Sequence, residues 1–413
     1  MKLIRTFARL TPAQRHAYFA ALGGWTLDAF DFFIFILCLD AIRSDFRTTI
    51  QAVAFGITLT LAMRPVGALV FGWMAEKYGR RPVLMLNVLS YALIELATAF
   101  SPNLAVLIAL RAAFGFAMGG EWGVGAALAF ETLPAEGRGF FSGLLQEGYV
   151  LGFLLAAALS RLLFSVVGWR GMFVIGAAPA LLVLYIRRGV AESPAWLAGR
   201  HRKRASMVQL WRIARTNVLL LLYMIVLMAF FNAFSHGSQD LYKPFLLKQL
   251  RLGNATADDL IMIMNVGALL GGICFGSLSE RIGRRKAIAL AAVLSLPVIP
   301  LWTYAPSVPL LALGAFLMQF MVQGAWGVVP AHLNELSPPG VRAVLPAFAY
   351  QLGNLAMALL APVQAGIAER HGNDYAWMLA WTLGIVAVTL TLVTLAGPEA
   401  RSLELSESAA TGG

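Results

Sequence analysis

A stripe of polar side chains lies within the long apolar segment 217–242. Its members follow an i, i+3, i+4, i+7, i+8 spacing, which places all of them on one arc of an α-helix: Asn232, Ser235, His236, Gln239 and Asp240. Polar groups at membrane depth face other protein groups or a wet cavity. Histidine titrates near neutral pH, and His236 and Asp240 are one turn apart, so we predict a proton relay. A structural hydrogen-bonding histidine is the alternative.

A single cation offers a second kind of chemistry, the recognition of an anion. Arg64 lies in the middle of the apolar segment 52–75, too deep for its head group to reach the membrane surface. Its planar guanidinium matches a carboxylate through two parallel hydrogen bonds. We therefore predict that Arg64 binds a substrate carboxylate. The alternative is an ion pair with Asp28 or Asp31, which lie one turn apart in segment 19–40.

The chain repeats itself at a fixed offset of 204 residues (76 to 280). The block GWMAEKYGRR, from Gly72 to Arg81, returns as GSLSERIGRR from Gly276 to Arg285. The same offset relates further pairs: Trp122 and Trp326, Gly123 and Gly327, Glu131 and Glu335, Pro134 and Pro338, Arg138 and Arg342. No gap accumulates over this span. The repeat predicts two homologous halves, an organisation typical of transporters that bind substrate between their repeats.

The offset also links polar side chains inside the apolar segments. Asp28 matches the first residue of the polar stripe, so we predict a cavity-facing role in proton coupling, with a structural pair as the alternative. Asp31 and Glu121 are assigned to proton coupling as well. Glu147 matches Gln351. The predicted substrate-binding residues, besides Arg64, are Asn232, Gln239, Tyr149, Gln351 and Asn354.

The repeated charged block joins a carboxylate at a helix end to a glycine turn and several cations. Such a cluster can hold one arrangement of the helix ends and release it in another. We predict gating roles for charged residues of both blocks: Glu76, Arg80, Arg81, Glu280, Arg284 and Arg285. We predict the same role for charged residues that follow the blocks in the chain: Arg111, Glu131, Arg138, Glu335 and Arg342. The alternative is that these cations only set the membrane topology.

Composition indicates a membrane protein with many spans. Of the 413 residues, 59% are hydrophobic and 13% charged, and the mean hydropathy is +0.73, whereas soluble domains are about 45–50% apolar. Twelve segments are long enough to cross a hydrocarbon core of about 30 Å: 19–40, 52–75, 83–101, 104–130, 140–164, 168–187, 217–242, 259–279, 287–304, 308–333, 341–368 and 374–395. The predicted fold is all-α, with twelve transmembrane helices in two six-helix repeats.

The predicted domains are a six-helix bundle at 1–187, a basic cytoplasmic linker at 188–215, a second six-helix bundle at 216–397 and a disordered cytoplasmic tail at 398–413. The net charge of +11 does not indicate nucleic-acid binding, because most of the 32 Lys and Arg fall in loops on one face. By the positive-inside rule both termini are cytoplasmic. We expect a monomer in the bilayer of a bacterial inner membrane, with no cofactor or metal and with the proton gradient as its driving force.

The doubled charged block resembles the signature loop of the major facilitator superfamily, and the resemblance covers the whole chain. Arg111 and Gly115 resemble the R-x-x-x-G element of that superfamily's second motif. The resemblance implies a central cavity lined by helices 1, 4, 7 and 10, with Glu76 and Glu280 in gating.

The polar stripe resembles N-x-x-[ST]-H-x-[ST]-Q-D-x-x-x-T of the sialate/lactate proton-symporter family, except that Pro244 replaces the final Thr. This resemblance implies proton-driven carboxylate uptake, with Asn232, His236, Gln239 and Asp240 taking part in transport.

The sequence therefore predicts a proton-coupled symporter that imports a small monocarboxylate such as lactate or pyruvate by alternating access. A symporter for sialate, an aromatic acid or another metabolite is the alternative within transport. A membrane sensor that binds without transporting is a third possibility. We predict no enzyme, because the chain has no H-E-x-x-H or G-x-S-x-G motif.

Overall fold

The computed structural model describes residues 7, 10–199, 212 and 215–399, and within them it contains helices and no strand. The N-terminal half contains α2 (Pro12–Asp45), α3 (Ile50–Tyr78), α4 (Arg80–Ala99), α5 (Leu104–Thr132), α6 (Arg138–Gln146), α7 (Gly148–Ile175), α8 (Ala180–Gly189) and α9 (Pro194–Ala198). The C-terminal half contains α11 (Val218–Gln239), α12 (Tyr242–Pro244), η1 (Phe245–Gln249), α13 (Asn254–Ile282), α14 (Arg284–Ser295), η2 (Leu296–Val298), α15 (Ile299–Thr303), α16 (Val308–Leu336), α17 (Leu345–Ala356), α18 (Leu360–Arg370) and α19 (Tyr375–Ala396).

Eleven helical runs of the described chain are long and apolar enough to cross a membrane. One of them, Arg138–Gly189, has 52 residues, which at 1.5 Å per residue gives about 78 Å, more than twice the hydrocarbon thickness. It is interrupted at Gly168, whose φ of 63° suits a residue without Cβ. Arg170, just after this break, donates to the Ala99 and Ser101 carbonyls at the far end of α4. The run therefore crosses twice, and the predicted multi-span, two-half fold is confirmed.

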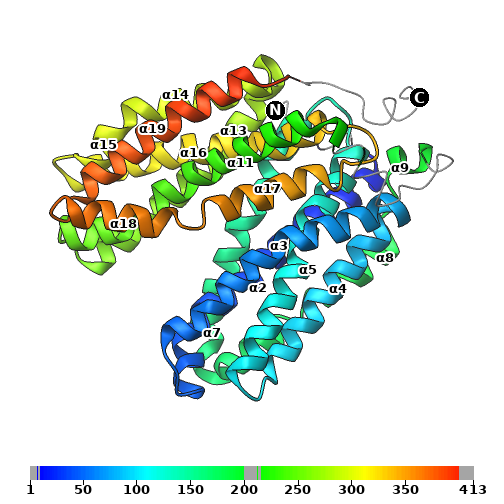
Figure 1. Cartoon of the computed structure of the whole chain (residues 1–413), viewed down its shortest axis with the longest axis horizontal. Coiled ribbons are helices and arrows are strands. Elements are labelled where there is room, and N and C mark those ends of the chain that lie inside the picture. Colours follow the sequence, from blue (N-terminus) through cyan, green and yellow to red (C-terminus); the bar gives the residue numbers. More distant parts are fainter. Residues whose placement is uncertain (1–6, 8–9, 200–211, 213–214, 400–413) are drawn as a thin grey trace.

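The two halves meet at one end of the molecule and diverge at the other (Figure 1). We name the ends by the helices that begin there: α4 and α14 begin at the closed end, and α5 and α16 begin at the open end. The first and last described residues also lie at the closed end, because Phe7 packs against Phe141 and Glu399 accepts hydrogen bonds from the backbone of Arg284 and Arg285.

Glycines allow the helices that carry the site to approach closely. A Cβ at Gly67 or Gly119 would meet a backbone carbonyl across the α3–α5 contact, as would one at Gly115. Gly267 and Gly271 lie in the same way against the α16 backbone. Small residues at such contacts let helix backbones touch where no hydrophobic effect drives association. The two contacts fix the positions of α3 and α16, which face the space between the halves.

Some helix ends differ from the predicted segments. The segment predicted at 217–242 ends at Gln239, and Asp240 caps α11. The segment predicted at 287–304 is interrupted by a 3-10 turn, and the one at 341–368 is divided between α17 and α18. Half of the predicted linker 188–215 lies outside the described residues, as does the predicted tail beyond Glu399.

Candidate substrate cavity and closed-end latch

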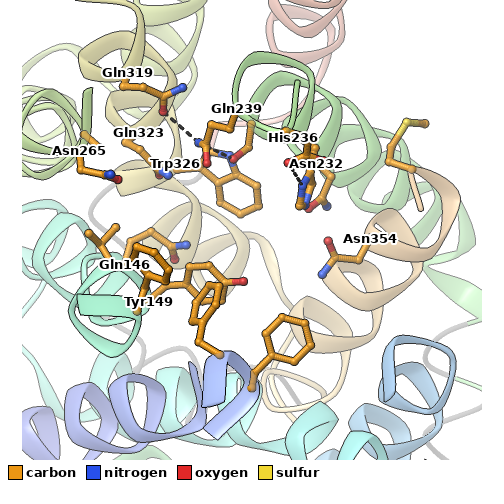
Figure 2. A pocket seen from close by; sticks show the side chains of 18 of the residues that line it. Gln146, Tyr149, Asn232, His236, Gln239, Asn265, Gln319, Gln323, Trp326 and Asn354 are labelled. Carbon is orange, nitrogen blue, oxygen red and sulfur yellow. Dashed lines mark hydrogen bonds and ion pairs between the residues drawn. The ribbon is translucent and has the colours of Figure 1, made fainter. Parts of the chain in front are cut away.

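A cavity of about 510 Å³ lies between the two halves. Figure 2 shows its labelled side chains converging on the central space from both halves. Its lining comes from α2, α3, α6, α7, α11, α13, α16, α17 and α18, whereas α5 contributes no lining side chain. Of the four helices that the resemblance implied, the first, seventh and tenth line this cavity and the fourth lies behind them.

The wall formed by the C-terminal half is rich in carboxamides: Asn232, Gln239, Asn265, Gln319, Gln323 and Asn354. Gln239 Nε2 donates to Gln319 Oε1 at 2.9 Å and to Ser235 Oγ at 3.1 Å. Gln319 Nε2 in turn donates to Ser238 Oγ at 2.8 Å. These bonds hold the amide groups in place, and each carboxamide combines donors with an acceptor. This wall can bind hydroxyl and carbonyl groups of a ligand.

The facing wall of the N-terminal half is aromatic and carries one cation. Phe33 makes edge contacts with Tyr149 and Phe153, with ring centroids 5.2 and 4.9 Å apart. Arg64 lies among these rings on the cavity lining and is only 3% exposed. Its Nε and Nη2 have no hydrogen-bond partner, and it forms no ion pair among the described residues. The predicted alternative, an ion pair with Asp28 or Asp31, is therefore not observed.

An unpartnered buried donor costs about 1–3 kcal/mol. The Arg64 guanidinium carries two such donors beside an open cavity. An anionic ligand that entered the cavity would satisfy them. Arg64 is thus the one described group that can hold a carboxylate here by a two-point contact.

His236 and Asp240 face the cavity where the sequence places them. His236 Nδ1 and Asp240 Oδ1 are 3.3 Å apart, and the two side chains are 47% and 36% exposed. The pair therefore sits in water at the cavity wall rather than deep in the protein. A proton that enters from the open end can reach it without crossing apolar packing.

The other predicted proton-coupling acids lie behind the cavity wall. Asp28, Asp31 and Glu121 are fully buried within the N-terminal half, and their carboxyl oxygens have no hydrogen-bond partner among the described residues. Gly24 makes room for the Glu121 carboxyl group. Arg64 interacts electrostatically with both Asp28 and Glu121. One cation thus lines the cavity and also interacts electrostatically with two buried acids.

Two predicted site residues lie away from their expected places. Arg111 Nη2 forms an ion pair with Glu95 Oε2 at 2.5 Å and a hydrogen bond with Thr98 Oγ1 at 2.8 Å. Both partners belong to the same half, so the structure does not bring Arg111 to the contacts between halves. Arg111 is also the ion-pair partner of Glu95, for which the sequence predicted no partner. Gln351 is 1% exposed and does not line the cavity.

The repeated charged blocks form two matching clusters at the closed end. Arg80 binds Glu131 through two hydrogen bonds of 3.0 and 2.9 Å, and its Nη1 lies 2.9 Å from Glu76 Oε2. Arg284 binds Glu335 in the same way, through two bonds of 2.9 Å, and its Nη1 lies 3.0 Å from Glu280. Buried charge pairs of this geometry satisfy each other's hydrogen-bonding groups.

Three bonds cross from one half to the other at these clusters. Arg138 Nη1 lies 3.2 Å from Glu335 Oε1, the Ala343 N–H donates to Glu76 Oε1 at 3.0 Å, and the Gly139 N–H donates to Glu280. We call these residues and the two clusters the closed-end latch. The remaining predicted gating residues lie beside it: Arg81 and Arg285 donate to carbonyls of Arg187 and Thr394, and Arg342 to Ser337.

Sequence reasoning missed several lining residues: Gln146, Asn265, Gln319 and Gln323. Gln319 and Gln323 are one turn apart in an apolar segment, the same signal that identified the polar stripe, and it could have found them. Glu192 was also missed. Its carboxylate accepts hydrogen bonds from the backbone N–H groups of Arg80 and Arg81 at the start of α4.

The comparisons with known proteins agree with this architecture. The Major Facilitator Superfamily matches residues 21–243 and 225–411 of the chain. The chain is 28% identical to the sialic acid transporter NanX of Escherichia coli, over 95% of each protein. It is 27% identical to the carboxylic acid transporter protein homolog of Saccharomyces cerevisiae, over 96% of this chain and 70% of that protein.

The structure also resembles a solved transporter. The proton:xylose symporter XylE bound to 6-bromo-6-deoxy-D-glucose superposes with a TM-score of 0.73 at 18% sequence identity, over 96% of this chain and 98% of that one. This likeness shows the shared fold, and the family match spans nearly the whole chain. The chain therefore belongs to the major facilitator superfamily and is a multi-pass membrane transporter of small molecules rather than an enzyme.

Proposed function

We propose that the protein imports a small organic carboxylate together with a proton by alternating access. The observation that carries this proposal is Arg64, a buried cation whose Nε and Nη2 have no hydrogen-bond partner among the described residues, on the wall of a cavity that also presents His236 and Asp240. The relatives named for carboxylic acid and sialic acid transport support a carboxylate substrate. We further propose a monomer in a bacterial inner membrane with cytoplasmic termini, so that the open end faces outward.

Coupling follows from the position of Arg64 between the cavity and the buried acids. A substrate carboxylate that binds the guanidinium competes with Asp28 and Glu121 for the same positive charge. Carboxylates that lose a nearby cation favour the protonated form. Substrate binding and proton uptake then support each other, with the His236–Asp240 pair exchanging protons with water in the cavity.

Uptake into proteoliposomes tests this function. Labelled lactate, pyruvate and sialate are supplied with and without an inward-acid pH gradient, with valinomycin and potassium to clamp the membrane potential. One monocarboxylate and one proton are neutral together, so accumulation is expected to follow the pH gradient and to ignore the potential. Accumulation that follows the potential at a constant pH gradient would contradict one-to-one proton symport.

The cavity also favours a second candidate, a symporter for a larger, ring-bearing or polyhydroxylated acid. A cavity of about 510 Å³ with six carboxamides on one wall and four aromatic rings on the other offers more contacts than a three-carbon acid can use. Ligand sites of this size hold drug-sized molecules. Sialate is therefore expected to outcompete lactate if this candidate is correct, and nicotinate and shikimate extend the comparison because related transporters are named for niacin and shikimate.

A further inference from the structure

Two seams join the halves at the closed end, and the repeat relates them. In the first seam, Gly139 and Gly143 of α6 lie against the backbone of Gly276 and Gly272 of α13. In the second seam, residues 343 and 347, which are the 204-offset partners of 139 and 143, lie against Gly72 of α3 and Gly123 of α5. Residues four apart share a helix face, so the first seam is a stripe of small residues on α6. The second is a matching stripe that begins at Ala343, two residues before α17, and continues on α17 at Ala347.

The next residue on each stripe is polar. On the first it is Glu147, which lies between α6 and α7 with its carboxyl group against Gly272. Glu147 is 3% exposed, and its Oε1 has no hydrogen-bond partner in the described part of the chain. On the second it is Gln351, which is 1% exposed and whose Oε1 and Nε2 have no hydrogen-bond partner among the residues that the structure describes. One seam therefore buries an acid at the position where the other buries a neutral amide.

The charged side chains of neighbouring helices that contact α6 lie at its first turn, away from Glu147. They are Glu280 of α13, Glu335 of α16 and Arg284 of α14. All three lie around Arg138 in the first turn of α6. That turn is eight or nine residues from Glu147, or about 12 Å along a helix. At the level of Glu147, α13 presents Gly272, α16 the Gln323 carbonyl, and α2 presents Leu22, Trp25 and Thr26 to the adjoining Gly148. Among the described residues, the remaining titratable groups near α6 are Tyr18 of α2, whose hydroxyl donates to the Phe141 carbonyl, Tyr149 beside Glu147 on α7, and His332 of α16, which is buried and interacts electrostatically with Arg284 of the latch.

We propose that Glu147 is a proton-binding site whose occupancy is linked to the closed end: the carboxyl group is protonated while the α6–α13 seam is closed and ionises when the seam separates. A protonated carboxyl has nearly the shape of the Gln351 amide and, like it, carries no charge, whereas a carboxylate without a cation is costly to bury. Separation of the halves admits water to Glu147 and removes that cost.

The consequence is a conformational equilibrium that depends on pH. A single group that binds one more proton in the closed form changes the closed-to-open ratio by up to about tenfold per pH unit. Acid on the side of the closed end favours closure, and neutral pH there favours opening. This inference rests on the alternating access of the proposed function, but it places the proton at the seam rather than in the substrate cavity.

The test is the distance between the halves at the closed end as a function of pH. Spin labels are attached at Glu136→Cys and Lys286→Cys, two exposed positions on opposite halves, in a Cys38→Ala, Cys274→Ala background in lipid nanodiscs without substrate. The closed fraction is recorded from pH 5 to 9 in four proteins: the labelled parent, Glu147→Gln, Gln351→Glu, and Glu369→Gln as a control at an exposed acid.

The closed fraction of the labelled parent protein is expected to rise as pH falls. Glu147→Gln is expected to lower the pH slope of the closed fraction by about one proton, and Gln351→Glu to raise it by about one, while Glu369→Gln leaves it unchanged. A Glu147→Gln protein with the parent slope would overturn the proposal, and if that variant does not fold, an unchanged slope in Gln351→Glu overturns it. The distances need no transport, so a failure of proton-driven uptake in the parent would count against the proposed function alone.

Discussion

Replacing Arg64 by lysine separates charge from geometry at the proposed carboxylate site. The substitution keeps one positive charge in the cavity wall but removes the planar fork, so one of the two hydrogen bonds to a carboxylate is lost. A hydrogen bond to a charged group is worth about 1.5–3 kcal/mol. At about 1.4 kcal/mol per tenfold, the dissociation constant should rise by about 10- to 140-fold.

Thermal stabilisation by substrate measures this change in detergent. At a substrate concentration of about 100 times the wild-type Kd, binding stabilises the wild type by about 2.7 kcal/mol, whereas a variant with a Kd about 100-fold higher gains only about 0.4 kcal/mol. The Tm shift should therefore nearly vanish, while the Tm without substrate stays close to that of the wild type because the charge and most of the volume remain.

A matched control uses the same substitution outside the cavity. Arg43 is half exposed and lies 3.6 Å from Asp40 at the end of α2, so Arg43→Lys should leave the substrate-induced Tm shift unchanged. A well-folded Arg64→Lys protein with the full wild-type shift would refute the reasoning, since the carboxylate would then be held by another group.

Three further predictions follow from the cavity, the seam and the latch. Asp240→Asn should abolish accumulation driven by a pH gradient yet retain exchange between equal substrate pools, whereas Asp258→Asn, on an exposed pair with Lys243, should retain both. Gly143→Leu should overpack the α6–α13 seam by about 1–3 kcal/mol, which lowers the closed-to-open ratio about 5- to 150-fold and slows exchange. Gly366→Leu, with open space around it, should exchange normally. Glu192→Ala should lose the cap of α4 and about 0.5–2 kcal/mol of stability, seen as a lower Tm, and Glu192→Gln should lose less; equal Tm values for all three proteins would exclude the capping role.

Features that depend only on the spacing of residues along the chain could be predicted from the sequence. The apolar segments and the 204-residue repeat specify the helices and the two halves, because span length and repetition are properties of the chain alone. The i, i+4 spacing of His236 and Asp240 likewise fixes their contact. Arg64 stood out because a charge in the middle of a span is rare enough to require a reason.

Features that depend on how helices pack against each other could not be predicted. Gln351 belongs to a polar-looking helix, but the seam with α3 and α5 turns it away from the cavity. The motif around Arg111 favours a gating role, yet Arg111 forms an ion pair with Glu95 of the neighbouring helix near the open end. Nothing in the sequence placed Glu95 beside it, because residues 16 apart on two helices meet only through tertiary packing.

Proton movement driven by substrate is the most direct test of the central claim. Proteoliposomes loaded with a pH-sensitive dye, with no imposed gradient and with the potential clamped, receive sialate or lactate outside, and protein-free vesicles correct for passive entry of the undissociated acid. Proton symport predicts acidification of the lumen that exceeds the protein-free signal, saturates with substrate and needs about 10- to 140-fold more substrate in Arg64→Lys. Saturable uptake of labelled substrate without any acidification beyond the protein-free vesicles would contradict it.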